Sequence, residues 1–202
     1  MSYISTVPVD EAEGDVQAMY ADNDAKMGYV PNYVKLFSHR PQVIGAWGNL
    51  LGSIRSNLDL RRYELATIAA ARGLRSSYCM MAHSSVLLKN DFSSEQLTAI
   101  ATDYTEADLQ PVDVAIMAFA EKIARDASSV TEADIQAMRD CGMTDTEIFD
   151  VAATAAARCF FSKLLDSLGA QPDSVFMSLE DTLRQCLTVG REVSQGAVEH
   201  AK

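Results

Sequence analysis

The stretch YELATIAAARGLRSSYCMMAH, residues 63–83, predicts two helices joined by a short connector. Its first half is rich in alanine and leucine, which favour a helix that we expect over residues 59–72. Ser76 or Ser77 is a suitable N-cap for a second helix over about residues 77–89. Two helices with so short a link should pack antiparallel against each other.

Cys79 is one of four cysteines and His83 one of three histidines, and they stand four residues apart. On a helix this spacing places them on one face, one turn apart. In the first turn of a helix the positive end of the dipole stabilises a thiolate, and an imidazole within reach can take the thiol proton. Glu64, on the preceding helix, is the candidate that orients the imidazole. The pattern therefore predicts Cys79, His83 and Glu64 as catalytic residues.

The same residues allow two other interpretations. A free cysteine is among the most buried residue types, so Cys79 and His83 can also be ordinary core residues. Cysteine, histidine and glutamate are also zinc ligands, although no second histidine or cysteine lies nearby in the sequence. We expect neither a metal ion nor a cofactor.

The rest of the sequence is predicted to be helical nearly throughout, because alternating strand patterns are almost absent. Ser93 with Gln96 and Thr144 with Glu147 form two capping-box patterns, each of which marks the start of a helix. A further helix is expected over residues 111–126, since proline is favoured in the first turn. The fold class that follows is all-α.

Glycines are expected to end two of these helices. Gly73 is a natural terminator for the helix over 59–72, and Gly169 for the long apolar helix that precedes it. Residues 1–190 should form a single all-helical domain. Residues 191–202 are polar and are expected to be a frayed tail.

A weak internal repeat links two of the helical segments. YELA and AAAR, at 63–66 and 69–72, recur with the same spacing as FDVA and AAAR, at 149–152 and 155–158. The repeat predicts two related helical units about a pseudo-twofold axis, although two alanine-rich helices can also match by chance. In this register Cys79 falls opposite Leu165 and His83 opposite Gly169. Only the first copy is therefore expected to carry polar chemistry.

Composition excludes several classes of function. The 202 residues are 48% hydrophobic and 22% charged, as in an ordinary soluble globular protein. The net charge of −11 argues against a nucleic-acid or anionic-membrane surface, because both need clustered basic residues. The N-terminus has no signal-peptide pattern, and no apolar run is long enough for a membrane span. We expect a soluble cytoplasmic protein whose cysteines are free thiols.

The stretch quoted above resembles the core motif of the carboxymuconolactone decarboxylase and alkylhydroperoxidase D-like superfamily, and most closely its peroxidase-related branch. That motif places a glutamate about a dozen residues before Cys-x-x-Cys-x-x-x-His, and Glu64, Cys79 and His83 match its Glu, second Cys and His. The resemblance covers about residues 25–190. It implies an alkylhydroperoxidase D-like helical bundle, usually homo-oligomeric, whose antioxidant peroxidase members attack a peroxide with the second cysteine and resolve the sulfenic acid with the first.

The sequence departs from that motif at its first cysteine, where Ser76 stands. A serine cannot form the resolving disulfide, so the resemblance implies an oxidoreductase with a single nucleophilic cysteine, a small peroxide substrate and an external thiol reductant. Tyr78 and Ser76 are possible auxiliary residues. Cys141, Cys159 and Cys186 have no spacing that brings them near Cys79.

Two alternatives to the peroxidase stay open. Glu64 and His83 can transfer protons to and from a small carboxylated or lactone substrate, as in the decarboxylase and lactone-processing branches. No arginine or lysine can be assigned to such a site, although Arg72 and Arg75 lie nearby in sequence. The chain can also be a non-catalytic oligomeric member of the family.

A few aromatic and polar residues complete the candidates. Trp47 and the pair Phe160-Phe161 are expected in the core or at a subunit contact, not as ligand stackers. Tyr29 and Asn32 are expected to border the site.

Overall fold

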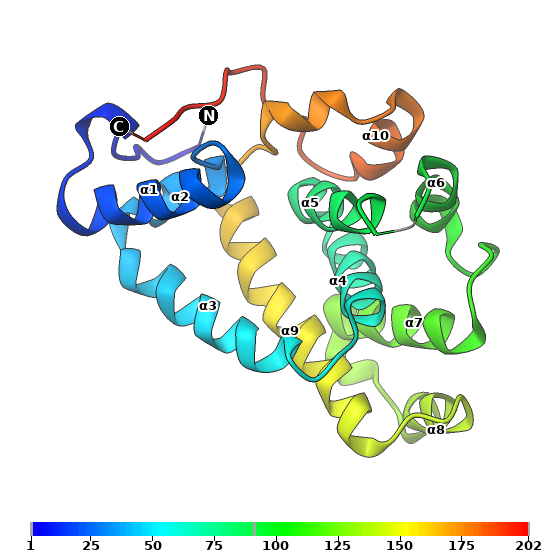
Figure 1. The fold of residues 1–202 in the computed structure, drawn as a ribbon. Helices are drawn as coiled ribbons and strands as arrows, with labels where there is room; N and C mark the ends of the chain where they lie inside the picture. Colours follow the sequence, from blue (N-terminus) through cyan, green and yellow to red (C-terminus); the bar gives the residue numbers. More distant parts are fainter. Residues whose placement is uncertain (1, 91, 202) are drawn as a thin grey trace.

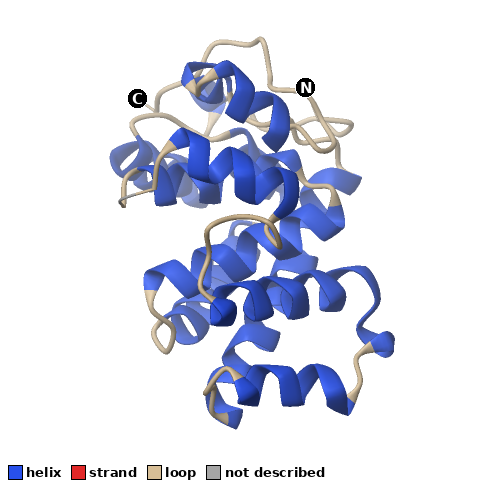
Figure 2. Cartoon of the chain, turned by 90° about the vertical axis from the view of Figure 1, so that its right-hand side faces the viewer, coloured by secondary structure: helices blue, strands red, loops and turns tan. Residues whose placement is uncertain are grey.

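The computed structural model describes residues 2–90 and 92–201, and within them it is an all-α bundle, as predicted (Figure 1). Helices and loops make up the whole of the described chain in Figure 2. The helices are α1 (Gly14–Met27), α2 (Asn32–Leu36), α3 (Pro41–Arg55), α4 (Leu60–Leu74), α5 (Ser77–Leu88), α6 (Ser94–Asp103), α7 (Pro111–Asp126), α8 (Glu132–Asp140), α9 (Asp145–Ser167) and α10 (Asp181–Leu187). No helix among these residues is both long enough and apolar enough to cross a membrane.

Helix α4 lies at the centre and packs against α5, α7 and α9. Its residues Tyr63 to Ala71 are all buried, which explains why the quoted stretch is so apolar. The alanines let neighbouring helices approach closely, and their burial contributes to the core without side-chain entropy cost.

Gly73 does not end α4 as the sequence predicted. The helix continues to Leu74, and the left-handed residue that ends it is Arg75, with φ of 57°. A Cβ on Gly73 would lie 3.1 Å from the Glu121 carbonyl oxygen of α7. The glycine therefore serves the close packing of α4 on α7, which sequence alone does not reveal.

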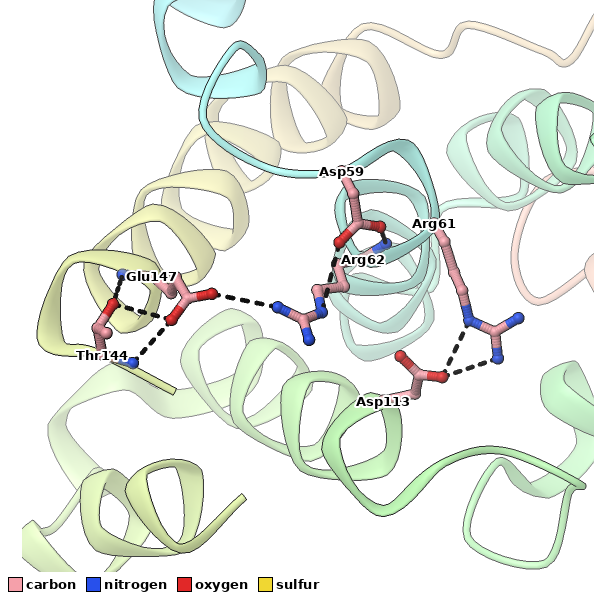
Figure 3. Close-up of polar contacts among 6 residues, drawn as sticks. All are labelled: Asp59, Arg61, Arg62, Asp113, Thr144 and Glu147. Carbon is pink, nitrogen blue, oxygen red and sulfur yellow. Dashed lines mark hydrogen bonds and ion pairs between the residues drawn. The ribbon is translucent and has the colours of Figure 1, made fainter. Parts of the chain in front are cut away.

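The first turn of α4 is held by ion pairs to two neighbouring helices (Figure 3). Arg61 pairs with the buried Asp113 of α7 at 2.7 Å, and Arg62 pairs with Glu147 of α9 at 3.2 Å. The Asp59 side chain accepts a hydrogen bond from the Arg62 backbone N–H and caps the helix. These contacts fix the start of α4, and with it the position of Glu64 one turn later.

The C-terminal segment is not the frayed tail that we expected. Val30 N–H donates to the Glu199 carbonyl at 2.7 Å, Lys35 pairs with the Glu199 carboxylate, and Val193 is buried. Gly190 N–H donates to Ser77 Oγ at 2.8 Å, at the start of α5. The backbone hydrogen bond to Val30 and the burial of Val193 hold the segment on the domain. Both contacts involve residues that are far from the segment in the sequence.

The internal repeat corresponds to α4 and α9, which pack together. The two copies differ in form, because the first breaks between α4 and α5 whereas α9 is one continuous helix from Asp145 to Ser167. Gly169, with φ of 80°, follows its end as predicted. The pseudo-twofold axis stays a prediction.

Candidate active site

Cys79 lies in the first turn of α5, as predicted, and its side chain is 2% exposed. Ser76 occupies the N-cap position, but its side chain makes no capping hydrogen bond. Ser77 Oγ instead accepts the N–H of Gly190. The structure therefore confirms that Cys79 lies at the positive end of the helix dipole. The predicted capping hydrogen bond to a serine side chain is not formed.

Two side chains of α9 donate hydrogen bonds to the Cys79 sulfur. Ser162 Oγ lies 3.1 Å from Sγ, and Arg158 Nη1 lies 3.7 Å from it. Both residues are buried. A hydroxyl and a guanidinium directed at a sulfur stabilise its thiolate form.

Sequence reasoning missed Arg158 and Ser162, because it assigned the polar chemistry to the first copy of the repeat only. A signal was present: in the same register Arg158 is the counterpart of Arg72, and Ser162 that of Ser76. Arg72 itself pairs with Glu121, and Arg75 donates to the Val189 carbonyl, so neither belongs to the site.

Glu64 and His83 are brought together as predicted. Glu64 Oε2 lies 2.5 Å from His83 Nδ1, and Glu64 is 2% exposed. Burial, followed by the charge of Arg158, lowers the pKa of His83, against the opposing effect of Glu64. A neutral imidazole whose Nδ1 donates to a carboxylate leaves Nε2 free to accept a proton.

The described residues include no hydrogen bond between His83 and the Cys79 sulfur. Both side chains nevertheless line one cleft of about 880 Å³, which lies among α1, α3, α4, α5 and α9. Its apolar lining includes Met19, Ile44, Trp47, Leu51, Val86 and Phe161, and its polar lining includes Arg55, Tyr63, Glu64, Cys79, His83 and Arg158, together with Asp15, Asp22 and Lys26 of α1. The volume suits a small organic molecule.

The aromatic residues only partly match expectation. Trp47 and Phe161 are buried and stacked with ring centroids 5.0 Å apart, as core residues should be. Both also line the cleft, where the Arg158 guanidinium lies 5.9 Å and 5.6 Å from their ring centroids. Phe160 is 49% exposed on the surface of α9.

Tyr78 lines the cleft, but its hydroxyl points to the buried carboxylate of Asp173, to which it donates a short hydrogen bond. Tyr29 Oη and the Asn32 backbone N–H donate to the same carboxylate at 3.3 Å and 2.7 Å. Tyr29 and Asn32 therefore surround Asp173 and do not line the cleft. Burial raises the pKa of Asp173 even though these donors oppose the shift.

Ser76 is completely buried and does not line the cleft either. Its hydroxyl stands near Asp166, where it partly offsets the burial that raises the pKa of that carboxyl. All four cysteines are free thiols. Across residues 2–90 and 92–201, no group of three or more histidine, cysteine, aspartate or glutamate side chains is arranged to hold a metal ion.

Comparison with known families confirms the resemblance seen in the sequence. Residues 41–122 match the model of the carboxymuconolactone decarboxylase family. This segment contains Glu64, Cys79 and His83, whereas Arg158 and Ser162 lie outside it. No curated protein matches the chain.

Solved structures extend the resemblance to the whole fold. The chain is similar to an uncharacterized peroxidase-related protein from Ralstonia eutropha JMP134, described as an alkylhydroperoxidase AhpD core, with 25% identity, a TM-score of 0.77, and 87% of this chain and 94% of that one covered. A peroxidase-related protein from Silicibacter sp. TM1040 has 20% identity, a TM-score of 0.69, and coverage of 87% and 91%. The debrominase Bmp8, bound to 2,3,4-tribromopyrrole, has 13% identity, a TM-score of 0.70, and coverage of 91% and 95%. The last two likenesses concern the fold alone.

Proposed function

We propose that this chain, which resembles the carboxymuconolactone decarboxylase and alkylhydroperoxidase D-like superfamily in motif and fold, is a thiol peroxidase with a single nucleophilic cysteine. The observation that carries the proposal is the environment of the Cys79 sulfur. It borders a cleft, lies at a helix N-terminus and accepts hydrogen bonds from Ser162 and Arg158. Each of these features favours a thiolate.

The reaction begins when His83 Nε2 accepts the thiol proton through one bridging water, because the two side chains share no direct hydrogen bond. The Cys79 thiolate attacks the terminal oxygen of a hydroperoxide, so that the S–O bond forms while the O–O bond breaks. The leaving alkoxide takes a proton from His83 and departs as an alcohol. Glu64 holds the imidazole through Nδ1 and stabilises its protonated form between the two transfers.

The sulfenic acid is then reduced by two molecules of an external thiol. The first forms a mixed disulfide with Cys79 and releases water, and the second attacks that disulfide, frees the Cys79 thiol and leaves as the oxidised reductant. An external thiol is needed because Ser76 stands where the family motif has its resolving cysteine.

Trapping of the sulfenic acid tests this proposal. The reduced protein is treated with cumene hydroperoxide and dimedone, and the labelled peptide is identified by mass spectrometry. We expect the label on Cys79 in the wild type and in the control Cys159→Ser, with peroxide consumption lost in Cys79→Ser. Label confined to the other cysteines, or unchanged peroxide consumption in Cys79→Ser, would rule the proposal out.

A second candidate function has one observation in its favour. The Glu64–His83 pair faces the cleft without a hydrogen bond to Cys79, as an independent acid–base pair would. Such a pair suits decarboxylase or lactone-processing chemistry on a small substrate. Turnover of such a substrate that survives Cys79→Ser but is lost in His83→Ala would establish this function. A family member without catalysis would tolerate both substitutions at a cost in stability only.

Homo-oligomer formation, which the family resemblance implies, is part of the proposal. Phe149 and Phe160 on α9 are 69% and 49% exposed, and Leu50 on α3 is 51% exposed. Exposed apolar side chains of this size are typical of an interface when they gather on one surface. Light scattering coupled to size-exclusion chromatography should give a mass above 22.0 kDa, and Phe160→Ser should lower it. A wild-type mass of one chain would contradict this part of the proposal.

A further inference from the structure

Most arginines of this protein pair with a carboxylate. Arg61 with Asp113 and Arg72 with Glu121 are two examples. The two arginines that line the cleft differ: within the described part of the chain, Arg55 has no carboxylate within ion-pair distance, and neither does Arg158.

Arg158 gives the stronger evidence for a ligand, because it is only 3% exposed. Its Nη1 donates to the Cys79 sulfur, but its Nε is buried without a hydrogen-bond partner. A buried guanidinium is costly unless its charge is compensated and its donors are satisfied. The Cys79 sulfur accepts from Nη1 only, so the unpartnered Nε–H indicates a place for a second acceptor.

Two of the cationic groups that line the cleft lie near His83 in an otherwise acidic protein. The net charge of the chain is −11, yet the lining includes the buried guanidinium of Arg158 and the exposed guanidinium of Arg55, and the Glu64 carboxylate near them is engaged by His83. Both arginines are close enough to His83 to lower its pKa, so their charges reach the same region. A low-dielectric cleft with such a field attracts an anion.

On α1 the cleft is also lined by Asp15, Asp22 and Lys26. Asp22 is paired with Lys26 at 2.6 Å, which leaves Asp15 as the other carboxylate of that wall. Beside Arg158 the wall is apolar and flat, because Trp47 and Phe161 are stacked there, whereas the Arg55 guanidinium lies over the Tyr63 ring. The cleft therefore combines two guanidinium groups with an aromatic surface.

We propose that this cleft binds an organic carboxylate, with its flat apolar body against Trp47 and Phe161 and its head group held by Arg55 and Arg158. The planar fork of a guanidinium matches the two oxygens of a carboxylate with two charge-assisted hydrogen bonds, and an uncharged ligand gives weaker ones. Binding of a carboxylate to the cleft does not depend on the proposed peroxidase function. Only the reaction of the bound molecule rests on that function. The substrate is then a hydroperoxide that carries a carboxylate.

The single tryptophan provides the assay. Trp47 is the only tryptophan of the chain and lines the cleft, so its fluorescence, excited at 295 nm where phenyl groups do not absorb, reports ligands directly. The probes are 3-phenylpropanoate, its neutral isostere 3-phenylpropanamide, and inorganic phosphate. We expect the carboxylate to bind at least about tenfold more tightly than the amide, and phosphate more weakly than the carboxylate.

Three matched variants locate the anion site. Arg55→Gln and Arg158→Gln should each reduce the preference for the carboxylate to about threefold or less. Arg139→Gln removes the same charge from an exposed pair with Asp145 and should leave the preference unchanged. Equal binding of carboxylate and amide to the wild type, or a preference that survives in both cleft variants, would overturn the inference. Phosphate binding as tight as that of the carboxylate would do so too.

Binding of the amide serves as a folding control for each variant, and peroxidase activity is measured separately from carboxylate binding. Continued binding of the amide shows that a variant has kept its cleft, and if Arg158→Gln does not fold, the exposed Arg55→Gln decides alone. Carboxylate binding without sulfenic acid formation would contradict the proposed function but support this inference. Peroxidase activity without a carboxylate preference would do the reverse.

Discussion

Replacement of Ser162 by alanine tests whether α9 sets the reactivity of Cys79. Ser162 Oγ is buried and lies 3.1 Å from the sulfur, so the hydroxyl is a direct donor to it. A hydrogen bond contributes about 1.5–3 kcal/mol when one partner is charged and about 0.5–1.5 kcal/mol when both are neutral. The thiolate therefore gains about 1–1.5 kcal/mol more from this donor than the thiol does.

That difference corresponds to a decrease of about 5- to 13-fold in the rate of reaction of Cys79 at neutral pH. The assay is alkylation by iodoacetamide, with the Cys79 peptide followed by mass spectrometry so that the other three cysteines do not interfere. Ser167→Ala is the control, because Ser167 lies on the same helix and its hydroxyl donates to the Leu164 carbonyl. The reasoning is refuted if Ser162→Ala alkylates at the wild-type rate, or if Ser167→Ala is slowed equally.

Three other outcomes follow from the contacts described. Because burial and Arg158 lower the pKa of His83 below its unfolded value of about 6.5, the stability contributed by neutral His83 is present above that pH and is lost as pH falls through the lowered pKa. Urea unfolding should therefore show the difference between wild type and His83→Gln shrinking below about pH 6.5, and a growing difference would be inconsistent. Tyr78→Phe removes a buried donor to Asp173 and should lower the free energy of unfolding by about 1.5–3 kcal/mol, whereas a loss below about 0.5 kcal/mol would contradict it. Gly190→Ala would place a Cβ 2.2 Å from the Arg75 carbonyl oxygen, so hydrogen exchange should increase over residues 191–201, and unchanged exchange would show that the segment is held elsewhere.

Local signals predicted the helices well. The helix over 111–126 has the expected bounds, and the capping boxes at Ser93 and Thr144 are both formed. Such signals depend on neighbours within one helical turn, so sequence contains all that they need. Gly73 and the C-terminal segment were misjudged, because their roles depend on Glu121 and Val30, which are distant in the chain.

The candidate site likewise contains residues that local signals mark and residues that only distant contacts bring in. Glu64 and His83 were paired from sequence because they lie on consecutive helices with a short connector. Arg158 and Ser162 approach the sulfur from 79 and 83 positions further along, where no local pattern marks them. The internal repeat was the one signal that reached that far, and it was interpreted as a sign of their absence.

The two donors to Cys79 both lie on α9, which is one continuous helix, whereas the Glu–Cys–His motif lies on α4 and α5. The motif determines which atom reacts, while substitutions on α9 can change how readily it reacts. Two proteins with identical Glu–Cys–His motifs can therefore differ widely in chemistry. Evolution, or an engineer, can retune the thiol from positions 158 and 162 without altering any residue of the motif.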